Sequence, residues 1–151
     1  MELLIIFMAK YLIVILVVLA GTFFATQSAP QKKRLFILGL VSFPLTYLIA
    51  KLAAHTFFDP RPFVTHHFTP LIPHDPDNGF PSDHALLSFA LANLVFAFNK
   101  KAGAGFFLLG FLVSLGRVLS GVHSWIDILG SFVIASVCVQ VSAAIVKKRM
   151  E

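Results

Sequence analysis

The sequence predicts an all-α, polytopic membrane helix bundle with about five transmembrane helices. Of its 151 residues, 58% are hydrophobic and 13% are charged, and its mean hydropathy is +0.86. Soluble domains carry about a quarter charged residues, so this chain has more apolar surface than one water-soluble core of its length can bury. The apolar residues also gather in five long runs. We therefore expect lipid to surround most of the chain.

Each apolar run is near the length that crosses about 30 Å of hydrocarbon as an α-helix. The runs cover residues 3–25, 35–58, 82–98, 103–120 and 125–146, of which the third and fourth are short. Five spans and their connections use up the chain, so we expect a single integral membrane domain over residues 1–151. The first run follows Glu2 and is too long for the apolar part of a signal peptide, which favours a retained span.

Basic residues mark one side of the predicted bundle. Eight of the twelve Lys and Arg residues lie in three clusters, at residues 31–34, 99–101 and 147–149. An odd number of spans places these three segments on the same side, and the positive-inside rule makes that side cytoplasmic. We expect the N-terminus outside and the C-terminus in the cytoplasm. Short basic clusters between apolar runs do not make a nucleic-acid surface, so no nucleic-acid partner is predicted.

The other two connections, residues 59–81 and 121–124, then face outward. They hold or flank almost every polar residue that could take part in binding or catalysis. These residues are Arg61, the 66–77 stretch, Ser82, Asp83, His84, Arg117, His123 and Asp127. Ionisable groups at the membrane level are costly unless they are paired or line a wet cavity. Their convergence on one face therefore predicts a functional site.

Two histidines in this group stand at predicted helix starts. His84 opens the third span and His123 the fifth. A helix N-terminus carries free N–H groups and a positive dipole, which suit an anion. Ser82 can cap its helix or offer its hydroxyl to a phosphate oxygen. Arg61 and Arg117 supply permanently charged forks that match phosphate geometry.

His123 and Asp127 are four residues apart, so on one helix face the carboxylate can accept the Nδ1 proton and leave Nε2 presented. Taken singly, a His–Asp pair of this spacing is more often a helix-surface hydrogen bond, and Arg117 could snorkel from a helix end to lipid headgroups. If there were no functional site, each of these structural interpretations would have to be correct at once, for residues that lie on the same face. The combination instead favours a phosphoryl-transfer site.

These residues resemble the three-part signature of the type 2 phosphatidic acid phosphatase superfamily, which also includes vanadium haloperoxidases. The resemblance covers residues 51–127 and is carried by Arg61-Pro62, Pro81-Ser82-Asp83-His84, and Gly116-Arg117 followed by His123 and Asp127. The resemblance implies a lipid phosphatase in which His123 attacks phosphorus, Asp127 orients it and His84 protonates the leaving oxygen. Arg61, Arg117 and Ser82 would bind the phosphate oxygens. No metal and no other cofactor is implied.

The chain departs from that signature at several positions. The lysine of the first motif is replaced by Ala54, and Lys51, one helical turn earlier, is the nearest substitute for contacting the phosphate. Asp83 stands where the second motif has Gly. A carboxylate beside a phosphate site is unfavourable unless it points away from the phosphate or binds a cation. We interpret Asp83 as a substrate-site residue that marks a subfamily. Gly116 replaces the Ser of the third motif. The family core commonly has six spans rather than five.

The sequence around the first two motifs, at residues 59–63 and 78–84, resembles the bacitracin-resistance type of undecaprenyl-diphosphatase. This resemblance implies conversion of undecaprenyl diphosphate to undecaprenyl phosphate at the outer face of a bacterial plasma membrane. Phosphatidic acid or phosphatidylglycerol phosphate fits the same geometry. A protein of another class, a transporter or binder that holds a phosphate headgroup without cleaving it, is disfavoured by the lack of detectable inverted repeats.

The loop residues His66, His67, His74, Asp75 and Asp77 raise the question of a metal site. The side chains of adjacent residues in an extended loop point apart, so His66 and His67 do not suggest a closed tetrahedral site. We expect loop residues that contact solvent or lipid headgroups. The predicted partners are a lipid phosphate or diphosphate and the surrounding membrane lipids; no oligomeric state is predicted.

Overall fold

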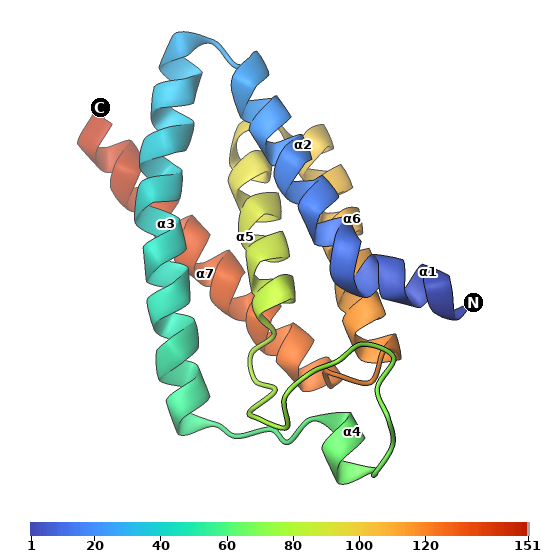
Figure 1. Cartoon of the computed structure of the whole chain (residues 1–151). Helices are drawn as coiled ribbons and strands as arrows, with labels where there is room; N and C mark the ends of the chain where they lie inside the picture. The colour runs from blue at the N-terminus through green and yellow to red at the C-terminus, as the bar shows by residue number, and fades with distance from the viewer. Residues whose placement is uncertain (151) are drawn as a thin grey trace.

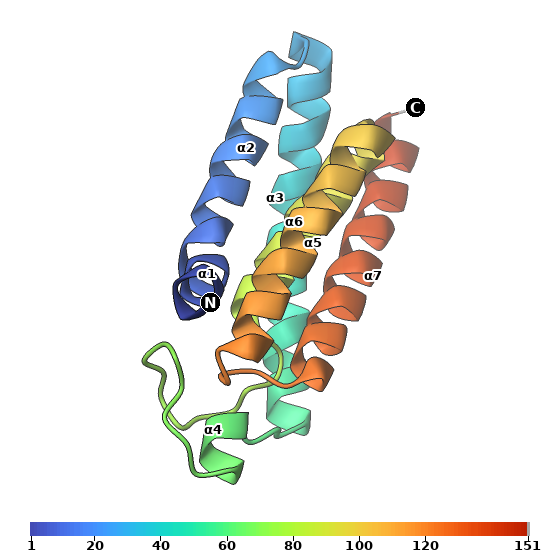
Figure 2. The same cartoon turned by 90° about the vertical axis from the view of Figure 1, so that its right-hand side faces the viewer.

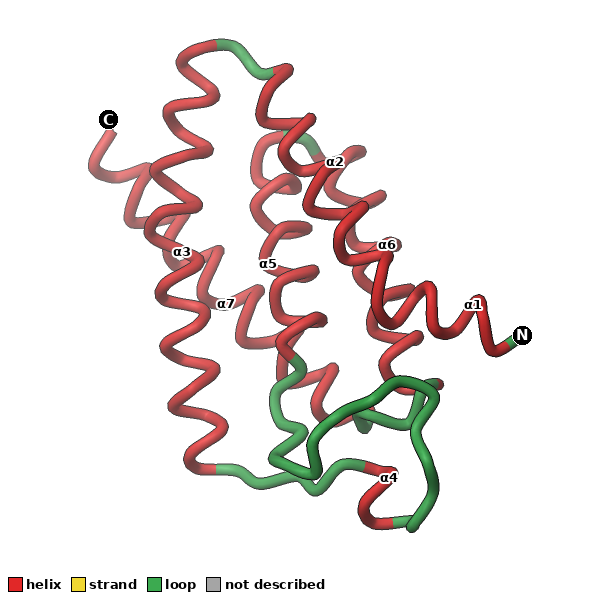
Figure 3. Tube along the Cα trace, viewed as in Figure 1, coloured by secondary structure: helices red, strands yellow, loops and turns green. Residues whose placement is uncertain are grey.

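The computed structural model describes residues 1–150, with the side chains of residues 1–148, and this part of the chain is a helix bundle without strands (Figures 1 and 3). Pro60 and Asn78 form an isolated β-bridge. The prediction of an all-α bundle is confirmed. The elements are α1 (Glu2–Ile6), the π-helix η1 (Phe7–Tyr11), α2 (Leu12–Thr26), α3 (Ala29–Thr56), α4 (Pro62–Thr65), α5 (Asp83–Phe98), α6 (Lys100–Leu119) and α7 (Trp125–Met150).

Among the described residues, four helical stretches are long and apolar enough to cross a membrane, by length and composition: Glu2–Thr26, Ala29–Thr56, Lys100–Leu119 and Trp125–Lys148. The third expected span is α5, which matches its predicted bounds to one residue. With 16 residues it extends about 24 Å, less than the hydrocarbon thickness. It is also the most enclosed helix, since residues 88–95 are all buried between the other helices. The chain is a multi-pass membrane protein with α5 at its centre.

The basic clusters lie inside helices and not in the connections where we expected them. Ser28 and Gln31 form a capping box that starts α3 before its basic residues, and the Asn99 side chain accepts a hydrogen bond of 3.0 Å from the backbone N–H of Ala102 at the start of α6. Lys and Arg are good helix formers, so these caps set the boundaries. The fourth span is consequently 20 residues long, and the expectation of a short one is wrong.

The ends of the bundle differ in character. The α2–α3 and α5–α6 connections and the C-terminus lie at one end, while the long connection from α3 to α5 and the α6–α7 turn lie at the other (Figure 1). The three basic clusters therefore gather at the end opposite the predicted polar site. The side chain of Arg149 lies outside the described residues.

The first span is bent, in contrast to the single straight helix that its apolar run predicts. Figures 1 and 2 show α1 turning away from the axis of α2, and the π-helical turn η1 lies between them, a usual cause of kinks. The backbone of η1 lies against α6 at Gly116. A Cβ atom there would stand 2.5 Å from the Ala9 nitrogen and 2.7 Å from the Met8 carbonyl carbon. Gly116 thus replaces the serine of the motif because η1 occupies the space.

Apolar side chains fill the centre of the bundle and cover its outside. Phe89 of α5 packs in a cluster with Ile128 and Ala135 of α7. Large hydrophobic side chains such as Phe36 and Val133 are exposed on the outer faces of the helices. A surface of this kind is stable only in lipid, which agrees with the composition of the chain.

Candidate active site

A cavity of about 290 Å³ lies at the end of the bundle where α3, α5 and α6 meet the two polar connections. Segments that are far apart in the sequence contribute to its wall. It is lined by Ala50, Lys51, Ala54, Arg61, His74, Asp77, Asn78, Phe80, Pro81, Asp83, His84, Arg117 and His123. Side chains from all three predicted motifs therefore share one cavity.

His123 and Asp127 form the pair that their spacing predicts. The Nδ1 atom of His123 lies 3.0 Å from Oδ2 of Asp127, and the backbone N–H of Ser124 donates to the same oxygen over 2.9 Å. Both side chains of the pair are buried. Because a carboxylate accepts hydrogen bonds, Nδ1 carries the proton and Nε2 keeps its lone pair.

Two guanidinium groups flank that free nitrogen. Nη1 of Arg61 and Nη2 of Arg117 each lie 3.4 Å from Nε2 of His123. Burial first, and then the positive charges of Arg117 and Arg61, lower the pKa of the His123 imidazole far below its ordinary value. The imidazole is therefore neutral, as a nucleophile must be, and it faces two permanent positive charges that suit an anion.

Arg61 is held in place by its own segment and by the α6–α7 turn. Its Nε donates to Oδ1 of Asp77 over 2.7 Å, Nη1 donates to the carbonyl of Val122 over 2.8 Å, and Nη2 donates to the carbonyl of Asn78 over 3.3 Å. Burial opposes ionisation of Asp77, but the hydrogen bond and charge of Arg61 prevail and lower the pKa of that carboxyl. These contacts fix the guanidinium beside His123.

Polar atoms of other predicted site residues lack a hydrogen-bond partner among the described residues, although Ser82 is not one of the residues that line the cavity. Nε of Arg117 and the hydroxyl of Ser82 are buried without a hydrogen bond. Ser82 occupies the N-cap position of α5, as its place before the third span predicts, but its side chain makes no capping hydrogen bond. A buried donor without a partner is unfavourable; oxygen atoms of a bound phosphate would satisfy such groups.

His84 and Asp83 enter the cavity from the first turn of α5. The His84 side chain is half-buried and the Asp83 side chain is exposed. Asp83 therefore lies on the wall of the cavity. The helix N-terminus there favours a negative charge, which helps α5 to tolerate it.

Lys51 and Ala54 both line the cavity, one turn apart on α3. The Lys51 side chain is exposed, and its Nζ lies 5.2 Å from the centre of the Tyr47 ring. The stem of Lys51 thus borders the cavity while its charge rests over an aromatic ring. Ala54, which stands at the lysine position of the family motif, places no charge in the cavity.

Three residues that help to build the site had no role in it in the sequence-based prediction. His74, which we expected to contact solvent or lipid headgroups, lines the cavity, and its ring centre lies 5.9 Å from that of His123. Burial and the charges of Arg61 and Arg117 lower the pKa of His74. Asn78 bonds to the carbonyls of Ala54 and Phe57 and so ties the loop to the end of α3. Its Asn-Gly dipeptide is a turn signal that could have indicated this position.

The third such residue is Asp59, whose carboxylate accepts a hydrogen bond from the Ser124 hydroxyl in front of α7.

Of the acidic and histidine-rich loop, His66, His67 and Asp75 are exposed. In the described part of the chain, no three His, Cys, Asp or Glu side chains are grouped as metal ligands would be.

Comparison with known proteins agrees with this geometry. The chain matches the PAP2 superfamily over residues 35–151. It is 36% identical over 133 residues to "Undecaprenyl-diphosphatase BcrC" of Bacillus subtilis (strain 168), covering 86% of this chain and 67% of that protein. It is 32% identical over 124 residues to "Bacitracin transport permease protein BcrC" of Bacillus licheniformis, covering 81% of this chain and 60% of that protein. The chain thus spans about two thirds of the first relative's length and less of the second's.

Proposed function

The chain belongs to the PAP2 superfamily, and we propose that it hydrolyses undecaprenyl diphosphate to undecaprenyl phosphate and inorganic phosphate. The observation that carries the proposal is the position of the His123 Nε2 atom between Arg61 and Arg117 with Asp127 behind it. A nucleophile, its orienting carboxylate and two cations for the phosphate oxygens are the parts that phosphoryl transfer needs. The first relative is named an undecaprenyl-diphosphatase, which supports this choice of substrate.

In the proposed reaction, Nε2 of His123 attacks the terminal phosphorus and the bond from phosphorus to the bridging oxygen breaks. The bridging oxygen leaves as part of undecaprenyl phosphate and takes a proton from His84. Water then attacks the phosphohistidine, giving its proton to His84, and inorganic phosphate leaves. Arg61 and Arg117 neutralise the phosphate oxygens throughout, and Asp127 stabilises the positive charge on the imidazole.

Lys51, Asp83 and His74 also line the cavity and complete the substrate site in this proposal. Lys51 and His74 can contact the second phosphate of a diphosphate. Ser82 contributes its unpaired hydroxyl to a phosphate oxygen. The positive-inside rule supports an outward-facing site in the cell membrane, because all three basic clusters lie at the other end of the bundle.

A binding or transport role is the second candidate, favoured by the name of the Bacillus licheniformis relative, a bacitracin transport permease protein. Binding alone needs cations, and it does not need a neutral imidazole held by a carboxylate. The two roles differ in whether phosphate is released.

The test is release of inorganic phosphate by the purified protein from undecaprenyl diphosphate, phosphatidic acid and phosphatidylglycerol phosphate, each with His123→Ala as the control. We expect the fastest release from the diphosphate. The rate should be the same with EDTA present, because in this proposal arginine side chains, and not metal ions, neutralise the phosphate oxygens. Faster release from a monophosphate would assign that lipid as substrate. Binding without release from any lipid would replace the enzyme by a binder.

A further inference from the structure

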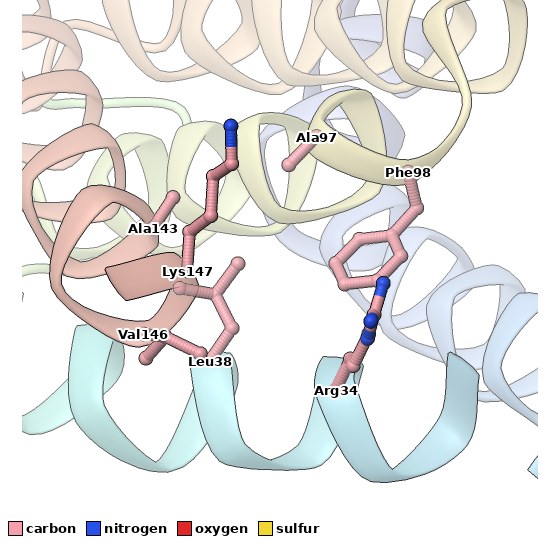
Figure 4. Close-up of a pocket in the computed structure, with 7 residues that line it drawn as sticks. All are labelled: Arg34, Leu38, Ala97, Phe98, Ala143, Val146 and Lys147. Carbon is pink, nitrogen blue, oxygen red and sulfur yellow. The ribbon is translucent and has the colours of Figure 1, made fainter. Parts of the chain in front are cut away.

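A second cavity, of about 300 Å³, lies at the end of the bundle opposite the candidate active site, between the start of α3 and the ends of α5 and α7 (Figure 4). Most of its wall is apolar. It is lined by Arg34, Leu38, Ala97, Phe98, Ala143, Val146 and Lys147. An apolar cavity with two cationic residues differs from the polar cavity of the active site.

The two cations come from different helices and border the same space. Figure 4 shows Arg34 of α3 beside Phe98 on one side, and Lys147 of α7 beside Ala143 on the other. Leu38 and Val146 are buried and belong to a cluster that joins α3, α5 and α7. The cavity therefore has an apolar floor with a positive charge on either side.

The surroundings of the cavity are also positive and apolar. Lys32 and Lys33 stand in the first turns of α3, and Lys148 follows Lys147 on α7. Ala97 and Ala143 also line a larger cavity of about 530 Å³ on the α6 side of α5 and α7, whose wall combines apolar residues with Asn93, Lys100, Ser136 and Gln140. Small side chains at these two positions leave room on both sides of the contact between these helices.

These features select the class of ligand. A soluble anion would be attracted by Arg34 and Lys147 but would leave the apolar wall exposed to water. A neutral lipid would cover the wall without using the charges. An anionic phospholipid uses both, and basic pockets between transmembrane helices hold such headgroups.

We propose that this cavity binds an anionic phospholipid of the membrane leaflet opposite the active site, with its phosphate between Arg34 and Lys147 and an acyl chain along Leu38 and Val146. The bound lipid joins α3 to α7, the helices that carry Lys51 and Asp127 of the candidate active site. This inference depends on charge and shape at the far end of the bundle, so it holds whichever lipid the active site hydrolyses.

The experiment is native mass spectrometry of the purified protein mixed with equal amounts of phosphatidylglycerol and phosphatidylcholine of identical acyl chains. We expect the wild type to retain phosphatidylglycerol in preference. The double variant Arg34→Gln/Lys147→Gln should lose about 30-fold of that preference, because it removes two hydrogen bonds made directly to the lipid phosphate. The matched control Lys32→Gln/Lys33→Gln removes two charges at the same end without touching the cavity wall, and should keep most of the preference.

Two further measurements test the shape of the site. Ala143→Leu fills the cavity without changing a charge, and should lower phospholipid retention. Glycerol phosphate, which has the headgroup charge without a chain, should not displace the phospholipid. Unchanged preference in the Arg34 and Lys147 double variant, an equal loss in the control, or displacement by glycerol phosphate would each overturn the proposal. Phosphate release by each variant checks that the bundle is intact.

Discussion

The carboxylate of Asp59 accepts a hydrogen bond of 2.5 Å from the hydroxyl of Ser124. The same hydroxyl accepts a hydrogen bond of 3.4 Å from the backbone N–H of Asp127, and the backbone N–H of Ser124 donates to the Asp127 carboxylate. The segment that carries Arg61 is thereby joined to the turn that carries His123. Asp59 does not itself line the cavity, and it contacts His123 only through Ser124 and Asp127, so we regard it as a positioning residue.

Asp59→Ala should lower kcat by about 2- to 12-fold with little change in KM, because the loss of one hydrogen bond is worth roughly 0.5–1.5 kcal/mol and acts on the geometry of the nucleophile. Asp59→Asn keeps an oxygen that can accept from Ser124 and should lose less. The measurement is steady-state phosphate release from undecaprenyl diphosphate. Asp75→Ala, an exposed carboxylate outside the cavity wall, is the control. A rise in KM alone would assign Asp59 to substrate binding.

Lys51 and Ala54 allow a rescue experiment. Lys51→Ala should raise KM for the diphosphate several-fold, because an exposed cation at the cavity edge contributes about 1 kcal/mol or less. Adding Ala54→Lys in the same chain restores a cation at the motif position, which also lines the cavity, and should recover the loss. Measurement of KM for the single and double variants shows whether a cation at position 54 can replace the one at position 51. No rescue, with intact folding, would show that Lys51 acts through its place over Tyr47.

The positions of the principal site residues could be predicted because their chemistry depends on local spacing. His123 and Asp127 are one helical turn apart, and any helix with that register brings them together. Arg61, His84 and Arg117 follow from topology alone, because alternate connections of a bundle meet at one end. The helix boundaries near residues 31–34 and 99–101 were missed because capping by Ser28 and Asn99 outweighed the polarity of the basic residues.

The contributions of His74 and Gly116 could not be predicted. His74 enters the cavity because Asn78 and Asp77 fold the long loop back over Arg61, and loop paths depend on such tertiary contacts. The replacement of serine by Gly116 is explained by the approach of η1. That contact joins residues about a hundred positions apart, and no local pattern in either segment indicates it.

The buried histidines make the stability of the protein depend on pH. Burial and nearby arginines lower the pKa of His74 and of His123 in the folded protein. Below the ordinary histidine value of about 6.5, the unfolded chain binds protons that the folded chain does not, so stability falls as the pH falls through that range. We expect a lower thermal midpoint at pH 5.5 than at pH 7.5 in detergent. His74→Asn should reduce the difference; the same difference in this variant as in the wild type would contradict the assignment.

The membrane orientation is tested by thiol labelling in intact cells. In a Cys138→Ser background, a cysteine at Thr69, in the long loop beside the cavity, should react with an impermeant reagent. A cysteine at Lys101, in a basic cluster at the other end of the bundle, should react only after the cells are permeabilised. The expectation rests on the positive-inside rule. The reverse pattern would place the active site in the cytoplasm and exclude an outer-leaflet substrate.

The nucleophile is tested by trapping the phosphorylated protein. Wild-type protein mixed with labelled undecaprenyl diphosphate and quenched rapidly should carry acid-labile, base-stable phosphate, and His123→Ala should carry none while still binding the substrate through Arg61 and Arg117. His84→Ala should slow turnover by about 10²–10⁴ because the leaving oxygen departs without a proton, and the loss should be smaller on a diphosphate, which has the better leaving group. Asp127→Asn should fall between the two, since an amide keeps a hydrogen bond but favours the other tautomer. Substantial turnover by His123→Ala would contradict the covalent mechanism and leave direct attack by water as the reaction.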